Sequence, residues 1–186
     1  MSYHYFAATL PGLQFGREPT MTAEAFRAQC QEHMSARDCA VVFALLDGGA
    51  SDHPYARAWR NGETQLRNAV AKLRATKLRG ADPAPWLREH RGVDVRIENR
   101  VAAAFQEADP LKRERALDQL RWDLAGEIAG YDTLSAEAVF AYAVRLGILL
   151  RQAKADPVKG RERLFAHARE QTDSHEPHSL PGNPQT

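Results

Sequence analysis

The chain lacks the features of a membrane-spanning or secreted protein. No apolar run approaches the roughly 18 residues that a membrane span needs, and residues 1–16 lack the basic start and long apolar segment of a signal peptide. The formal net charge of the 186 residues is +1, so no whole-chain field attracts nucleic acid or a membrane surface. We therefore expect a cytoplasmic protein without direct membrane insertion.

Motifs of enzyme chemistry are missing as well. No GxxxxGKS/T, GxGxxG or GxSxG pattern occurs, so a phosphate loop, a dinucleotide fold and a serine hydrolase are not indicated. None of the seven histidines has the HExxH or HxxxH spacing that places two metal ligands on one helix face, although His175 and His178 leave a weak metal contact open. The sequence predicts no catalytic residue, no metal, no cofactor and no enzyme.

Cysteine is scarce. Cys30 and Cys39 are the two cysteines, and no CxxC pattern accompanies them. In a reducing cytoplasm we expect both to be small buried apolar residues, with a redox pair as the alternative.

What the chain does contain is apolar spacing of helical period, which predicts an all-α fold. The pattern favours six or seven helices stacked as antiparallel hairpins, after a short extended N-terminal segment in which Tyr3 and Tyr5 share a face. Residues 1–171 are predicted to form a single helical domain and residues 172–186 a disordered C-terminal tail. The expected helices cover residues 22–34, 35–47, 55–79, 93–108, 110–129, 135–155 and 157–170.

Capping signals mark several of these helix starts. Thr22, Ser35, Asp109 and Ser135 are predicted N-caps, because a short side-chain oxygen satisfies a free N–H of the first turn. Pro110 follows Asp109 at the first helical position, where proline is favoured.

The strongest packing pattern lies in residues 117–151, which predict a helical hairpin. Trp122 lies off the apolar seam of its helix, so it either packs on another helix or faces a partner. Tyr142 on the next helix has the same two interpretations, and Trp86 in the connector 80–92 is expected to pack that connector down. Acidic residues at 114, 118, 123 and 127 are expected to form surface ion pairs with neighbouring arginines. The seam consists of Leu117, Leu120, Leu124 and Ile128.

The helix at 55–79 is rich in basic residues and is the clearest binding signal. Such a surface attracts phosphates, meets an acidic protein partner, or is simply solvated. No aromatic residue for base stacking follows Trp59 in this helix, which disfavours nucleic acid. Gly62 inside the helix suggests the close approach of another backbone. The cations are Arg57, Arg60, Arg67, Lys72, Arg74, Lys77 and Arg79, against the single acid Glu63.

The opening YHYFAATLP at residues 3–11, with Phe15-Gly16, resembles the start of an uncharacterised bacterial family encoded among the subunits of V/A-type (vacuolar/archaeal-type) ATPases. Residues 140–149 (FAYAVRLGIL) are similar near the other end. Between them the resemblance includes Trp59, Arg67, Leu73, Arg74, Arg121, Trp122 and Tyr131.

The resemblance implies a non-catalytic coupling subunit or accessory factor of a proton- or sodium-translocating rotary ATPase. It implies subunits of that ATPase as partners and a position peripheral to the inner membrane through the complex. An all-α chain could replace the helical subunit that joins the central shaft to the membrane ring, with a stalk or assembly factor as further alternatives. The alternative function is a soluble nucleic-acid-binding or general protein-interaction module that uses the basic helix 57–79. The candidate partner-binding residues are Trp59, Arg60, Arg67, Arg74, Trp122 and Tyr142.

Overall fold

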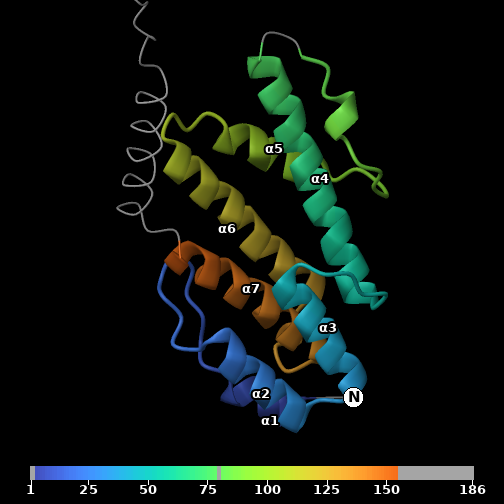
Figure 1. The fold of residues 1–186 in the computed structure, drawn as a ribbon, viewed down its shortest axis with the longest axis vertical. Coiled ribbons are helices and arrows are strands. Elements are labelled where there is room, and N and C mark those ends of the chain that lie inside the picture. Colours follow the sequence, from blue (N-terminus) through green and yellow to red (C-terminus); the bar gives the residue numbers. More distant parts are fainter. Residues whose placement is uncertain (1–2, 79–80, 155–186) are drawn as a thin grey trace, which may run out of the picture. The chain divides into compact units, whose positions relative to one another are not determined.

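The structure is a computed structural model that describes residues 3–78 and 81–154. Within these ranges it contains seven α-helices, one short 3-10 helix (η1) and no strand, which confirms the all-α prediction (Figure 1). The elements are α1 (His4–Thr9), α2 (Ala23–His33), α3 (Ala36–Asp47), α4 (Pro54–Lys77), η1 (Ala84–Trp86), α5 (Val95–Ala104), α6 (Pro110–Ala129) and α7 (Ala136–Lys154).

The chain divides into two units, Met1–Arg151 and Gln152–Thr186. Of the second unit, the described residues are 152–154, the end of α7. The helix predicted at 157–170, the domain limit at residue 171 and the tail at 172–186 lie outside the described residues. Arg79 of the basic helix also lies outside them.

The capping predictions are confirmed. Each predicted N-cap side chain accepts a hydrogen bond from a backbone N–H of its first turn, which satisfies a donor that the helix itself leaves unpaired. The pairs are Thr22 with Ala25 at 3.2 Å, Ser35 with Asp38 at 3.2 Å, Asp109 with Leu111 at 2.9 Å and Ser135 with Ala138 at 3.2 Å.

The predicted extended N-terminal segment is wrong, because residues 4–9 form α1. Tyr3 and Phe6 are buried, whereas Tyr5 is 79% exposed. Residues three apart share one face of a helix and residues two apart do not. The Tyr3 hydroxyl donates to Asp38 Oδ2 at 2.5 Å and accepts from Ser35 N at 3.1 Å, which fixes the start of α1 against α3.

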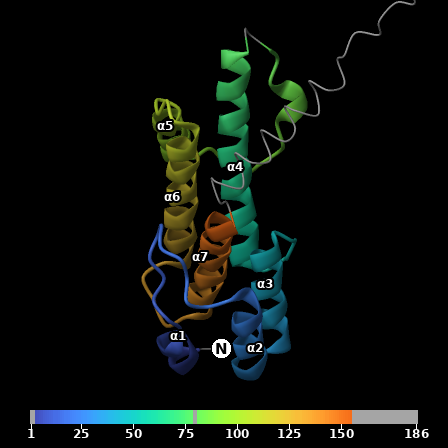
Figure 2. The same cartoon turned by 60° about the vertical axis from the view of Figure 1, so that its left-hand side comes forward.

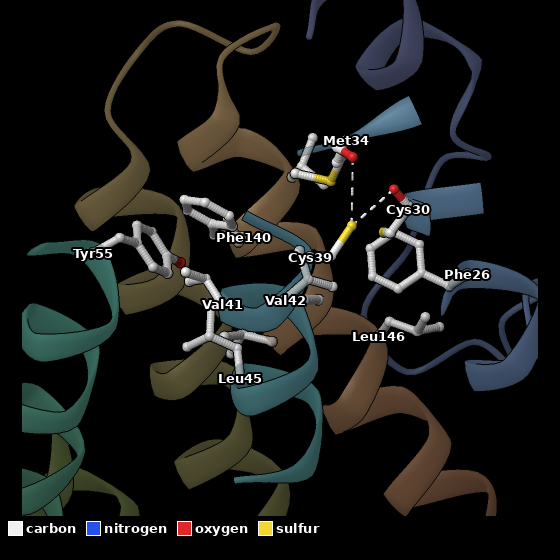
Figure 3. Close-up of a cluster of buried hydrophobic side chains, with 14 of the residues drawn as sticks. Phe26, Cys30, Met34, Cys39, Val41, Val42, Leu45, Tyr55, Phe140 and Leu146 are labelled. Carbon is white, nitrogen blue, oxygen red and sulfur yellow. Dashed lines mark hydrogen bonds between the residues drawn. The ribbon is translucent and has the colours of Figure 1, made fainter. Parts of the chain in front are cut away.

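A first hydrophobic core lies among α1, α2, α3 and α7, with the first turns of α4 and the last turns of α6. Figure 2 shows α7 between α6 and α3. Several of its side chains are fully buried, and Figure 3 draws part of this cluster. The side chains drawn include Phe26, Cys30, Val42, Tyr55, Phe140 and Leu146.

Both cysteines belong to this core, as predicted. Cys30 and Cys39 are free and buried, and the Cys39 thiol donates to the carbonyl oxygen of Cys30 at 3.0 Å (Figure 3). Burial, and secondarily the nearby Cys39, raises the pKa of the Cys30 thiol to about 12. Both sulfurs therefore stay protonated at neutral pH and pack as small apolar groups.

A second hydrophobic core lies among α4, α5 and α6. Figure 1 shows α5 beside α4 and α6, at the end of these two helices far from α2 and α3. Because α4 and α6 contribute to both cores, these two helices connect them. The buried residues of the second core are Leu66, Ala69, Val70, Ile97, Val101, Ala104, Phe105, Leu117 and Leu120.

The predicted helix 93–108 is shorter than expected. Asp94 caps α5 by accepting from Arg96 N at 2.9 Å, so the helix begins at Val95 and leaves Val93 exposed before it. α5 ends at Ala104, and Phe105 turns into the second core.

Gly62 allows a close approach in the middle of α4, but by a side chain and not by a backbone. A Cβ atom at residue 62 would lie 2.7 Å from Leu124 Cδ2 of α6. The missing methyl group therefore lets α6 pack closely against α4.

An ion-pair network joins α4, α6 and α7. Arg121 bonds Glu63 through Nε at 3.0 Å and Asp118 through Nη1 at 3.1 Å, and Arg151 also bonds Asp118. Asp118 is buried, so the prediction of a surface pair is wrong at this position. Asp118 lies on the face of α6 that turns toward α7, and its carboxylate pairs there with Arg121 and Arg151. Arg67 adds a further contact to Glu63 at 2.8 Å.

Candidate protein-interaction site

An apolar groove lies between α4 and α6, next to η1, with a volume of about 490 Å³. We call it the α4–α6 groove. Its buried floor comes from Leu66 and Leu117 of the second core. The remaining apolar lining is Val70, Ala71, Ala75, Leu78, Ala81 and Trp86, and the polar lining is Arg67, Arg74, Glu114 and Arg121.

Two large apolar side chains of this groove are exposed to solvent. Trp86 is 69% exposed and Leu78 is 71% exposed. The prediction that Trp86 packs the connector down is therefore wrong. Exposed apolar side chains that border an apolar groove are typical of protein-interaction surfaces.

The connector 80–92 is held by side-chain amides of α4 and not by Trp86. Asn68 donates to the carbonyl of Arg88 at 2.7 Å and accepts from the N–H of the same residue at 3.0 Å. Asn61 makes the same pair of bonds with Arg91, at 2.9 Å and 2.6 Å. Gln65 accepts from Asp94 N at 2.8 Å. The three amides share one face of α4, and sequence reasoning missed them.

Arginines flank the groove. Arg67 and Arg74 are mostly exposed, and the Arg74–Glu114 contact is loose at 3.7 Å. Arg121 is largely buried in its pairs with Glu63 and Asp118, which hold the pKa of its guanidinium above its ordinary value against the cost of burial. The groove therefore combines an apolar floor with arginines along its border.

The predicted partner-binding residues fall into three separate places. Arg67 and Arg74 border the α4–α6 groove. Trp59 packs against the first core, and Arg60 is exposed beside it on α4. Trp122 and Tyr142 line a second pocket at the other end of α6. The structure therefore does not bring the six residues into one site.

Trp122 and Tyr142 both make internal contacts. The Trp122 ring meets Phe15 edge-on, with 5.6 Å between ring centroids, and the Arg145 guanidinium lies 5.0 Å from its centroid. Tyr142 contacts Phe26 at 5.0 Å between centroids. Its hydroxyl is buried without a hydrogen-bond partner among the described residues, and burial raises its pKa to about 12.

The basic residues of α4 are largely used within the chain. Lys72 pairs with Glu98 at 3.4 Å, and Lys77 donates to the carbonyl of Phe105 at 3.4 Å while lying 5.3 Å from that ring centroid. With Arg67 and Arg74 already paired to acids, the net field of this helix is weaker than its composition indicates.

Residues 3–78 and 81–154 contain neither a cluster of metal ligands nor a membrane-spanning helix. No group of three or more His, Cys, Asp or Glu side chains there is placed to hold a metal ion. In the same ranges no helix has both the length and the apolar character needed to cross a membrane.

Comparison with known families gives one partial similarity. A family model described as "Protein of unknown function (DUF2764)" matches residues 96–168, which is less than half of the chain. The described part of the match runs from α5 through α7 and includes Trp122, Tyr142 and Arg145. Neither the curated proteins nor the solved structures contain a significant match to the chain.

Proposed function

We propose that this protein is a non-catalytic coupling subunit or accessory factor of a bacterial V/A-type rotary ATPase, and that it docks on another subunit through the α4–α6 groove. The observation that carries the docking proposal is the pair of exposed apolar side chains, Trp86 and Leu78, beside an apolar groove flanked by arginines. The choice of complex depends on the resemblance of residues 3–16 and 140–149. The protein would then be cytoplasmic and reach the inner membrane through the complex.

The occupant that fits this groove is an amphipathic helix of a partner subunit. An apolar side chain of such a helix would fill the space above Leu66 and Leu117, against the ring of Trp86. Acidic side chains one turn away would meet Arg67 and Arg74. Aromatic and arginine residues carry most of the affinity in interfaces of this kind.

The packing of the helices supports a mechanical role. α4 and α6 each pass through both cores, and the Glu63–Arg121–Asp118 network joins them to α7. Force applied at the groove would therefore reach the first core through continuous helices. A coupling or stalk component needs such a body, because a soft connection would absorb the motion that it must transmit.

The test is purification of the endogenously tagged full-length chain from membranes, followed by mass spectrometry. We expect the catalytic and shaft subunits in a fixed ratio, and their loss in the double variant Trp86→Ser/Leu78→Ser. Leu111→Ser is the matched control, because Leu111 is an exposed leucine outside the groove. Absence of every ATPase subunit from the wild-type purification overturns the proposal.

The alternative is a nucleic-acid-binding module that uses the basic helix. Arg57 and Arg60 make no ion pair within 4.0 Å in the part of the chain that the structure describes, so they are its best phosphate contacts. This function predicts binding whose log affinity falls linearly with log salt concentration. No binding at about 50 mM salt, where phosphate contacts are strong, would exclude it.

A further inference from the structure

A second pocket, with a volume of about 810 Å³, lies where the loop after α1 meets the end of α6 and the middle of α7. We call it the Trp122 pocket. Its volume lies within the range of small-molecule sites. Apolar wall residues include Leu10, Pro11, Leu13, Ala138 and Ala141, and all of them lie in the unit Met1–Arg151.

Arg145 of α7 is the notable cation in this pocket. Its Nε donates to the carbonyl oxygen of Trp122 at 3.1 Å, and its guanidinium lies over the indole ring. Across the described part of the chain, no acidic side chain lies within 4.0 Å of it. Partial burial lowers the pKa of this guanidinium from its ordinary value. Arg145 is thus a half-buried cation whose Nη groups have no ion-pair partner among residues 3–78 and 81–154.

The charge of Asp123 acts on Arg145 and opposes the lowering of its pKa by burial, but the carboxylate of Asp123 already has other hydrogen-bond partners. Both carboxylate oxygens of Asp123 accept hydrogen bonds, one from Arg100 and one from Gln119 at 2.8 Å. Glu127 lies 3.5 Å from Arg96 on the rim of the same pocket. These pairs leave Arg145 as the cation available to a ligand.

Gly126 of α6 provides the seat of this guanidinium. A Cβ atom at residue 126 would lie 2.2 Å from Arg145 Nη2. Glycine inside a helix costs about 1 kcal/mol relative to alanine. Here the absence of a side chain lets the guanidinium of Arg145 lie against α6. The indole of Trp122 and its backbone carbonyl then fix the plane of the guanidinium.

We propose that the Trp122 pocket binds a ligand through a single carboxylate group, which pairs with the guanidinium of Arg145. A planar guanidinium held at one edge by a carbonyl presents its Nη groups in the geometry that a carboxylate accepts. The apolar wall would cover the body of the ligand. This proposal is independent of the proposed function, because it concerns a different surface.

The charges around the pocket favour a monoanion. Asp123, Glu127 and Asp132 line it along with Arg145 and Arg96. A phosphate or a dicarboxylate would bring a second negative charge close to these acids, whereas one carboxylate is matched by one guanidinium. Monocarboxylates should therefore bind more tightly than dicarboxylates of the same size.

The experiment is a titration of the full-length protein, labelled with ¹⁵N, with benzoate as the probe. Benzamide is the neutral control, phthalate the dicarboxylate and inorganic phosphate the second anion. We expect saturable shifts of the Trp122 indole N–H and the Arg145 Nε–H with benzoate, and weaker shifts with the other three. N-acetyl-phenylalanine and an amidated peptide with one internal glutamate then distinguish a free carboxylate from an acidic side chain of a partner.

Two variants disrupt the pairing between Arg145 and the carboxylate of the ligand in different ways. Arg145→Met removes the charge, and Gly126→Ala keeps the charge but displaces the guanidinium. Each should weaken benzoate binding about tenfold or more, since a hydrogen bond between charged groups contributes at least that factor. Arg115→Gln is the matched control, because Arg115 is an exposed arginine of α6 that does not line the pocket. Its affinity should stay within about twofold of wild type.

Several outcomes would overturn the proposal. One is the absence of benzoate binding up to about 50 mM, well beyond the range of a weak specific site. Another is equal binding of benzamide. A third is unchanged benzoate affinity in Gly126→Ala. This variant alone tests the proposal if Arg145→Met does not fold.

Discussion

Burial changes the acid–base behaviour of individual side chains in the first core. It raises the pKa of the Cys30 thiol from 9.0 to about 12 and that of the Tyr142 phenol from 10.0 to about 12. Burial also raises the pKa of Tyr55, whose hydroxyl donates to the carbonyl of Ala125 at 2.8 Å. The folded state therefore keeps these protons at pH values where an unfolded chain releases them.

The first prediction is a loss of stability in alkaline solution. The folded-state pKa values are raised, so the contribution of these groups is fully present below pH 9.0 and is lost as pH rises toward about 12. Each such group adds up to about 1.4 kcal/mol of lost stability per pH unit in that window. Urea unfolding at about pH 8 and about pH 10.5 measures the effect. Equal unfolding free energies at the two values would contradict it.

The second prediction concerns the hydroxyl of Tyr142. Because it is buried without a partner among the described residues, Tyr142→Phe should raise the unfolding free energy at neutral pH by about 1 kcal/mol. The same variant should flatten the alkaline loss above about pH 10. Tyr131→Phe is the control, since the Tyr131 side chain is fully exposed. A destabilised Tyr142→Phe would show that the hydroxyl has a favourable interaction in solution.

At the scale of the elements, the ion-pair network is the feature that joins helices distant in sequence. The Glu63 side chain is 15% exposed and that of Arg121 is 16% exposed. The third prediction is that Arg121→Met lowers the unfolding free energy by about 3 kcal/mol, because Glu63 and Asp118 lose their buried cation and keep the more exposed Arg67 and Arg151. Chemical denaturation measures the loss. The double variant Glu63→Gln/Arg121→Met should recover part of it.

The exposed pair Arg100–Asp123 provides the comparison. Both of its side chains are more than a third exposed, so Arg100→Met should cost less than about 1 kcal/mol. If the two arginine variants were equally destabilised, burial would not be the reason for the effect.

The fourth prediction concerns the connector that α4 holds by its side-chain amides. Asn68→Ala removes both bonds to the backbone of Arg88, so amide hydrogen exchange at residues 86–91 should rise while the core helices stay protected. Asn99→Ala is the control, because Asn99 is exposed on α5. Unchanged exchange in the connector would mean that other contacts fix it.

The sequence predicted most of these elements because their signals are local. A cap such as Thr22 or Asp109 needs only its own first turn, and the apolar period of α6 and α7 needs only the helix itself. α1 was missed because six residues are too short for a period to show, and its start depends on Asp38 and Ser35 far along the chain.

The sites depend on long-range contacts, so the sequence predicted them less well. Arg67 and Arg74 were correctly placed on an exposed face of α4, but the groove beside them needs α6 and η1. The amides Asn61, Gln65 and Asn68 left a signal that sequence reasoning did not use, since they recur at helical spacing on one face. Nothing in a single sequence shows that Gly126 seats Arg145, because the two lie on different helices.

At the scale of the whole unit Met1–Arg151, two cores share α4 and α6. The fifth prediction is that they unfold together, since neither core can lose its packing without exposing one half of both shared helices. We expect a single denaturation midpoint for the whole unit. Leu66→Ala in the second core and Val42→Ala in the first should each lower it. Leu66→Ala should cost about 2–5 kcal/mol and Val42→Ala less, because it removes fewer methyl groups.

Denaturation followed by far-UV circular dichroism and by tryptophan fluorescence tests this cooperativity. Trp59 and Trp122 report on the first core, and Trp86 borders the second. Coincident curves are expected for both variants. Two separated transitions, with each variant shifting only one, would show that the cores are independent.

The way in which α4 holds the connector has a consequence for how this protein can diverge. Asn61 and Asn68 hold the connector through hydrogen bonds to the main chain of residues 88 and 91, and these bonds do not involve the side chain of Trp86. The backbone N–H of Trp86 donates to the carbonyl of Pro83, so residues other than proline at position 86 are compatible with the same loop geometry. Substitutions there would exchange one binding preference for another at almost no cost to folding, so the protein can acquire new partners while its scaffold stays constant.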